Sequence, residues 1–274
     1  MKTCRFIAAL IVSLLIAGAA SAATDASATL RDLCPDRPGK GTSPCTVDAG
    51  HVQLEVEIFN GSRQDQDGIV TRSYAIANPT LKFGVTDRLD IEANIAPYLN
   101  VTTRDKASGQ SDTVSGIGDL FLRAKYAISS DGQPLSVAIE PFLKLPTASH
   151  DLGNGSVEGG VLLPVALDLG HGTQLSATPE LDVLQNEAGD GTHVGVVNVL
   201  GLSQAVGQGV ALSAELWEFT DADPSGTAQQ YSFDLAGAWQ PEGQPNLQFD
   251  AGVNFGLNNE TPDIQVYCGI ARRF

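Results

Sequence analysis

The last ten residues of this 274-residue chain constrain its fold more than any other segment. The segment 265–274 alternates between two kinds of side chain and ends on an aromatic residue. Small, polar or amphipathic residues separate four apolar ones, Ile264, Val266, Cys268 and Ile270. A strand needs this period of two when one face contacts hydrocarbon and the other faces water. We therefore expect the closing strand of a transmembrane barrel, with an edge strand of a soluble sheet as the alternative.

The chain end also predicts how such a barrel is assembled. A terminal phenylalanine in an alternating strand resembles the last strand of bacterial outer-membrane barrels, which the barrel-assembly machinery recognises. Phe274 would provide this signal here. Arg272 departs from the alternation because it falls on the apolar side. We expect it near the membrane edge, where an arginine can extend its guanidinium to the lipid headgroups.

The first 23 residues predict a secretory signal peptide. Lys2 and Arg5 precede an apolar run over 6–19, and residues 20–23 offer a cleavage site of small side chains. The apolar run is short for a membrane-spanning helix, and no second run of this kind follows it. We therefore expect an exported chain and exclude a helical membrane protein. The net charge of −16 argues against nucleic acid as a partner.

Two of the cysteines flank a segment rich in proline and glycine. Cys34 and Cys45 are expected to form a disulfide, because exported proteins fold in an oxidising compartment. A metal site is the rival interpretation, although the segment has no C-x-x-C pair and no nearby histidine cluster. Cys268 is interpreted as a small apolar residue on the outer face of the last strand.

Alternation between turn signals predicts an all-β fold, a transmembrane antiparallel up-and-down β-barrel of about twelve strands. The predicted organisation is a signal peptide (1–23), an N-terminal periplasmic extension or plug (24–49) and the barrel (50–274). Five prolines fit poorly, because each removes a hydrogen-bond donor from a strand, and we place them at strand ends or bulges: Pro79, Pro97, Pro141, Pro164 and Pro179. The expected strands cover 52–59, 74–83, 89–98, 120–126, 135–144, 161–169, 174–183, 194–202, 210–217, 231–239, 247–255 and 264–274.

The predicted connections are long and short in turn. The long or polar ones cover 60–72, 100–115, 146–156, 186–192 and 220–228. The tight ones cover 84–88, 129–134, 170–172, 207–209 and 240–245. Outer-membrane barrels have short periplasmic turns and longer external loops. The pattern therefore predicts a protein of the Gram-negative cell outer membrane, surrounded by its lipids, with both chain ends on the periplasmic side.

The same register predicts a charged interior. Charges that face lipid at mid-membrane each cost about 2–4 kcal/mol, so the charged positions should face the lumen. These are Glu55, Glu57, Lys82, Asp90, Glu92, Arg123, Lys125, Glu140, Lys144, Glu180, Asp182, Glu215, Asp234 and Asp250. They could line a polar conduit or binding cavity, or form structural ion pairs that fill a narrow barrel.

Motifs for catalysis are missing from the sequence. It contains no G-x-S-x-G, Walker or H-E-x-x-H motif, so we expect no enzyme, no catalytic residues, no metal and no cofactor, with a loose calcium site in the acidic loops as an open alternative. An outer-membrane phospholipase-like hydrolase is one alternative, but it needs adjacent Ser and His on the outer face, and His193 and Ser203 lie too far apart along one strand. A secreted soluble β protein serving as an adhesion or binding module is the other.

Several segments resemble one family, the MetA-pathway-of-phenol-degradation proteins of the outer membrane. The similar segments are 34–38 (CPDRP), 42–55, 116–126, 144–147 and 261–267. The resemblance covers essentially the whole mature chain. It implies a passive transporter or channel for small molecules, aromatic or hydrophobic ones among them. It identifies no substrate-binding residues.

Overall fold

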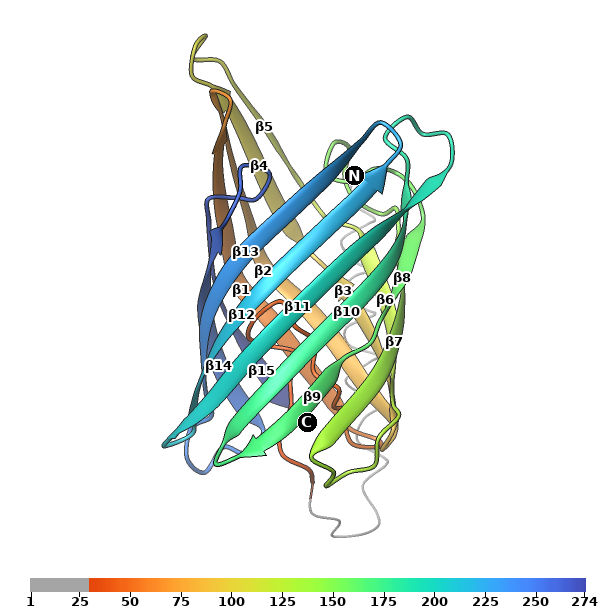
Figure 1. Ribbon diagram of the computed structural model, residues 1–274, viewed down its shortest axis with the longest axis vertical. Coiled ribbons are helices and arrows are strands. Elements are labelled where there is room, and N and C mark those ends of the chain that lie inside the picture. The colour runs from red at the N-terminus through yellow and green to blue at the C-terminus, as the bar shows by residue number, and fades with distance from the viewer. Residues whose placement is uncertain (1–29) are drawn as a thin grey trace, which may run out of the picture. The chain divides into compact units, whose positions relative to one another are not determined.

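The computed structural model describes residues 30–274, whose strands form one antiparallel sheet that closes on itself (Figure 1). The predicted signal peptide lies outside the described residues. No helix in the described part of the chain is long and apolar enough to cross a membrane. The strands are β1 (Val52–Gln66), β2 (Ile69–Thr86), β3 (Leu89–Ile95), β4 (Tyr98–Asp105), β5 (Ser111–Gly116), β6 (Leu120–Ala127), β7 (Leu135–Leu145), β8 (Glu158–Leu162), β9 (Val165–Gly170), β10 (Thr173–Gln185), β11 (Thr192–Gly207), β12 (Val210–Asp223), β13 (Gly226–Trp239), β14 (Leu247–Gly256) and β15 (Ile264–Arg273).

These segments make twelve crossings of the barrel wall, as the sequence predicts. β3 and β4 pair with successive parts of β2 and so form one interrupted crossing. β5 and β6 form a second interrupted crossing, because they pair with β4 and β3 respectively. β8 and β9 form a third, since both pair with β7 and with β10. β1 pairs with β15 and closes the cylinder.

Two of the five prolines explain two of the interruptions. Pro97 separates β3 from β4, and Pro164 separates β8 from β9, because proline has no backbone N–H to donate. The ladder is partly kept at the second break, where the Pro164 carbonyl accepts a hydrogen bond of 2.9 Å from the Ala138 N–H. The other three prolines remain in paired strand positions: Pro79, Pro141 and Pro179.

The two faces of the wall have opposite chemistry. On β7, the outward side chains of Ile139 and Leu143 are 39% and 41% exposed, whereas the inward Glu140 is 1% exposed. The last strand follows the predicted alternation, with Val266 exposed and Ala271 fully buried. Large apolar side chains exposed all around a closed wall need a hydrocarbon environment. The chain therefore has the fold of a transmembrane barrel.

Three of the predicted long loops are wrong, because the strands continue through them. β1 and β2 extend to a turn at Asp67 and Gly68, β4 and β5 occupy most of 100–115, and β12 and β13 occupy most of 220–228. Figure 1 shows the β4–β5 hairpin rising beyond the other strands. Backbone pairing alone maintains these extensions, so their side chains do not need an apolar face. The alternating pattern therefore underestimates the lengths of these strands.

A charge placed on the outer face should destabilise the barrel according to its depth. Leu200 lies at the centre of β11 and is 51% exposed, whereas Leu257 lies just past the end of β14 and is 59% exposed. We expect Leu200→Arg to lower the free energy of unfolding by about 2–4 kcal/mol and Leu257→Arg by about 0–1 kcal/mol. Urea unfolding in lipid vesicles measures both, and equal losses would contradict a lipid-facing wall.

Candidate functional site

A loop of the chain that precedes the barrel lies inside the lumen (Figure 1). Its two ends are held near the end of the barrel where the C-terminus lies. There the Leu33 carbonyl accepts a hydrogen bond of 3.3 Å from Gln240 Nε2, and Asp48 pairs with Arg273 at 2.6 Å. The predicted disulfide between Cys34 and Cys45 is confirmed and joins the two arms of the loop. We call residues 33–48 the plug.

The first attachment of the plug is a buried ion-pair network around Asp36. Lys125 Nζ lies 2.7 and 2.8 Å from the two carboxylate oxygens of Asp36, and Lys82 also donates to it. Burial would raise the pKa of Asp36, but the two ammonium groups outweigh it and hold this pKa well below its usual range. Both lysines are nearly inaccessible to solvent, and further wall carboxylates surround them: Glu55, Glu92 and Glu140.

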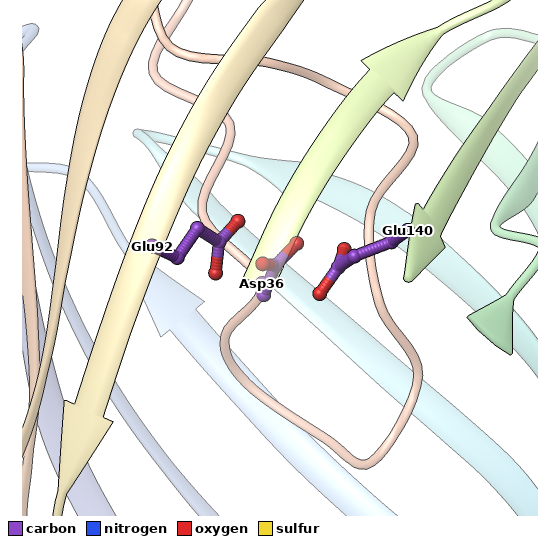
Figure 2. A group of neighbouring side chains, drawn as sticks. All are labelled: Asp36, Glu92 and Glu140. Atoms are coloured by element: carbon purple, nitrogen blue, oxygen red, sulfur yellow. The ribbon is translucent and has the colours of Figure 1, made fainter. Parts of the chain in front are cut away.

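Three of these carboxylates could be mistaken for a metal site. Asp36, Glu92 and Glu140 point towards one another from the plug and two strands, with one oxygen of each within 4.8 Å of the others (Figure 2). However, Lys125 Nζ lies 3.5 Å from Glu92 and 3.3 Å from Glu140, and Lys82 Nζ lies 3.4 Å from Glu92. The ammonium groups thus supply the positive charge that a bound cation would bring, and we interpret the cluster as an anchor.

The second attachment is made by the next residue of the plug, Arg37. Arg37 donates two hydrogen bonds to Asp250 of β14, at 2.8 and 3.2 Å, a bidentate geometry that fixes the guanidinium. The Arg37 carbonyl also accepts a hydrogen bond of 2.9 Å from Gln248. The last strand leaves room for this contact at Gly269, where an added Cβ would lie 2.3 Å from the guanidinium.

The tip of the plug reaches a third part of the wall, formed by β12 and β13. The Lys40 N–H donates to Glu215 at 2.8 Å, and its ammonium donates to Ser232 at 2.7 Å. The same ammonium lies 3.8 Å from the centroid of the Trp217 ring. Gly39 fits here for two reasons: its φ is +102°, and an added Cβ would lie 2.6 Å from the Glu215 carboxylate.

The lumen contains a cavity on each side of the plug. A cavity of about 340 Å³ lies towards the barrel end remote from the C-terminus, lined in part by Asn78, Asn94, Phe121, Arg123, Phe142 and Glu180. A second cavity of about 240 Å³ lies towards the C-terminal end, lined in part by Gln174, Ser176, Ser203, Ala238 and Gln248. Asp36, Arg37 and Thr42 line both, so the plug stands between two chambers.

The structure divides the predicted lumenal residues into groups. Most of them contact the plug or its anchor: Glu55, Glu57, Lys82, Asp90, Glu92, Lys125, Glu140, Glu215, Asp234 and Asp250. Arg123 lies 3.6 Å from Glu140 and stacks near Phe121 and Phe142. Glu180 lines the larger chamber beside Asp182 on β10. Lys144 pairs instead with Glu158 at 2.6 Å and Asp119 at 3.6 Å, away from the plug.

Sequence reasoning missed the plug residues that make these contacts. Asp36, Arg37 and Lys40 lie in a segment without alternation, so no face could be assigned to them. The sequence feature that could have identified them is charge complementarity with the wall. The wall carries an excess of inward carboxylates, and the short segment between the two cysteines contains two cations that could pair with them.

Comparison with known proteins identifies the family. The sequence profile described as "Putative MetA-pathway of phenol degradation" matches residues 35–274. The chain belongs to this family. The resemblance noted in the sequence is therefore confirmed over almost the whole described chain. No curated protein matches the chain.

Solved structures agree with the barrel fold. An outer membrane channel from Pseudomonas putida F1 superposes with a TM-score of 0.66 at 15% sequence identity, covering 87% of this chain and 99% of that one. The transport unit of the autotransporter AIDA-I from Escherichia coli gives a TM-score of 0.50 at 9% identity, covering 95% and 96%. At such identities the likeness shows the fold alone. The predicted outer-membrane barrel fold is thus confirmed.

Removing the Asp36 carboxylate should release the plug. Asp36→Asn leaves two buried lysines with less negative charge around them, and breaking a buried pair typically costs about 3–5 kcal/mol. We expect amide exchange over residues 33–48 to accelerate by more than about a hundredfold. Asp65→Asn is the matched control, because Asp65 pairs with Arg63 and Lys106 beyond the lumen and should not affect this exchange. Unchanged exchange in Asp36→Asn would show that the network does not anchor the plug.

Proposed function

We propose that this protein is a passive channel for small molecules in the Gram-negative outer membrane, and that the plug controls the flow. The observation that supports this most directly is the placement of the plug between two lumenal chambers. A barrel that served only as an anchor would not need open space on both sides of such a loop. Family membership and the barrel fold agree with a transport role rather than an enzymatic one.

The larger chamber suggests the size and kind of solute. Its volume of about 340 Å³ is at the lower end of the range of small-molecule sites. Phe121 and Phe142 present two rings into it, 6.2 Å apart between centroids, with Arg123 beside them. Rings at this spacing offer a surface to a flat or apolar molecule, while Asn78 and Asn94 can orient a polar substituent. We therefore propose small aromatic or hydrophobic solutes.

The proposed partners follow from the outer face and the chain end. Outer-membrane lipids would cover the apolar wall, and the assembly machinery would recognise the strand that ends at Phe274. Arg272 points outward with its guanidinium 5.2 Å from the Phe274 ring, which suits the headgroup level of the membrane. The acidic charge of the chain continues to argue against nucleic acid.

The two alternatives from the sequence are less well supported. A phospholipase-like site would need a histidine available to a serine. His193 instead faces two carboxylates, with Nε2 2.6 Å from Asp221 and Nδ1 3.2 Å from Asp223. A soluble adhesion module does not agree with a closed wall whose outer face is apolar.

Reduction of the disulfide tests the channel and its gate together. The bond between Cys34 and Cys45 closes a short loop and should contribute on the order of 3 kcal/mol to the order of the plug. In planar bilayers we expect small, stable conductance steps that become larger when a reductant is added and return after oxidation. All proteins would be purified without the predicted signal peptide, which contains Cys4, and would carry Cys268→Ser, so that no other thiol can react.

The double variant Cys34→Ser/Cys45→Ser serves as the control for this experiment. Its conductance should equal that of the reduced protein and should not change when the reductant is added. A folded barrel that passes neither ions nor small solutes in either redox state would refute the proposed function. A conductance that does not respond to reduction would support the channel function but would show that the plug does not control the flow.

A further inference from the structure

The plug attaches to the wall with two different strengths. Asp36 is held by two buried lysines that keep its pKa low, so that attachment favours the charged state. At the tip the balance is reversed. The Lys40 side chain is 22% exposed and its ammonium lies 3.8 Å from Asp234, beyond hydrogen-bond distance, and burial lowers the pKa of Lys40 by more than Asp234 and Glu215 raise it. The contact at Lys40 is therefore the one that competition would break first.

The groups around the Lys40 ammonium form a recognisable set. The Trp217 ring lies 3.8 Å from Lys40 Nζ, the Ser232 hydroxyl accepts from it at 2.7 Å, and Asp234 Oδ2 lies at 3.8 Å. Ser232 and Asp234 are each 1% exposed. An aromatic face attracts organic ammonium ions through cation–π interaction, and a nearby carboxylate attracts them by its opposite charge. In this structure the cation is part of the protein itself.

The surroundings offer more room than a lysine fills. A cavity of about 220 Å³ adjoins the ammonium and is bounded by Lys40, Trp217, Ser232, Asn254 and Gln265, among others. Asn254 is 4% exposed, and its Oδ1 accepts no hydrogen bond from the described residues. Neither oxygen of Asp234 accepts one there either. A buried acceptor without a donor is unfavourable, so these atoms favour a ligand that carries donors or positive charge.

We propose that Trp217, Ser232 and Asp234 form a binding site for small organic ammonium ions on the lumenal wall, and that Lys40 of the plug occupies it as an internal competitor. A free ammonium ion with a larger head would use the adjoining cavity as well. Its binding would displace Lys40 and separate the tip from β12 and β13. The effect on flow rests on the proposed channel function, whereas the site itself does not.

Tryptophan fluorescence measures binding at this site without any transport. The chain has two tryptophans, so Trp239→Phe leaves Trp217 as the only one. The Trp239→Phe protein, with and without Lys40→Ala, would be titrated with choline chloride in detergent. Titration with sodium chloride at equal ionic strength is the control. We expect a saturable change with choline whose half-saturation concentration is at least about tenfold lower in Lys40→Ala, because the internal competitor is gone.

A carboxylate variant separates recognition from general effects. Asp234→Asn in the Lys40→Ala protein should weaken choline binding by about tenfold or more. Asp65→Asn is the matched control, since Asp65 pairs with Arg63 and Lys106, lies outside the cavity lining and should leave binding unchanged. Heat-modifiable migration on a gel checks the folding of each variant. Calorimetric titration of Lys40→Ala with both tryptophans retained repeats the measurement independently.

The outcomes distinguish the site from the channel. The site is refuted if choline and sodium act alike on Lys40→Ala, or if Asp234→Asn binds choline as well as its parent does. Saturable choline binding to a protein that conducts nothing would support the site and refute the channel. Conductance without saturable choline binding would support the channel and refute the site.

Discussion

The structure depends on the pairing of β1 with β15. A backbone that crosses hydrocarbon must satisfy every N–H and C=O within the protein, and a sheet can do so only when it has no free edge. The pairing of the first and last strands provides this closure along most of their common length. It also divides the side chains into an outer apolar face and an inner charged one. The polar character of the lumenal wall follows from this division.

A closed wall of this size creates a space that its own side chains do not fill. The wall charges are mostly acidic and would repel one another if they stood alone in the lumen. The plug changes this balance by bringing charges of both signs to chosen positions. Asp36 pairs with Lys82 and Lys125, while Arg37 and Lys40 pair with acidic residues of other strands. The plug is thus held by charge complementarity at three places and leaves chambers on either side.

If an organic ammonium ion displaces Lys40 as proposed, the tip of the plug would move while its base stays in place. The Asp36 network and the disulfide lie towards the base, where the arms of the loop are joined. The tip is flanked by Gly39 and Gly41, whose backbones have the most freedom. A displacement that breaks the Lys40 contacts would therefore leave the base in place. This arrangement explains how a narrow conduit could open without the loss of its buried ion pairs.

The sequence by itself determined the barrel, its strand count, the orientation of its faces and the disulfide. Each of these depends on local information: a period of two, the turn residues, and two cysteines close together in an exported chain. It did not determine where the strands end beyond the membrane, because paired polar strands and polar loops have similar compositions. Only the tertiary structure decided that the N-terminal segment lies in the lumen and which charges meet there. Those contacts join residues such as Asp36 and Lys125 or Arg37 and Asp250, which are far apart in the chain and come together only in the folded barrel.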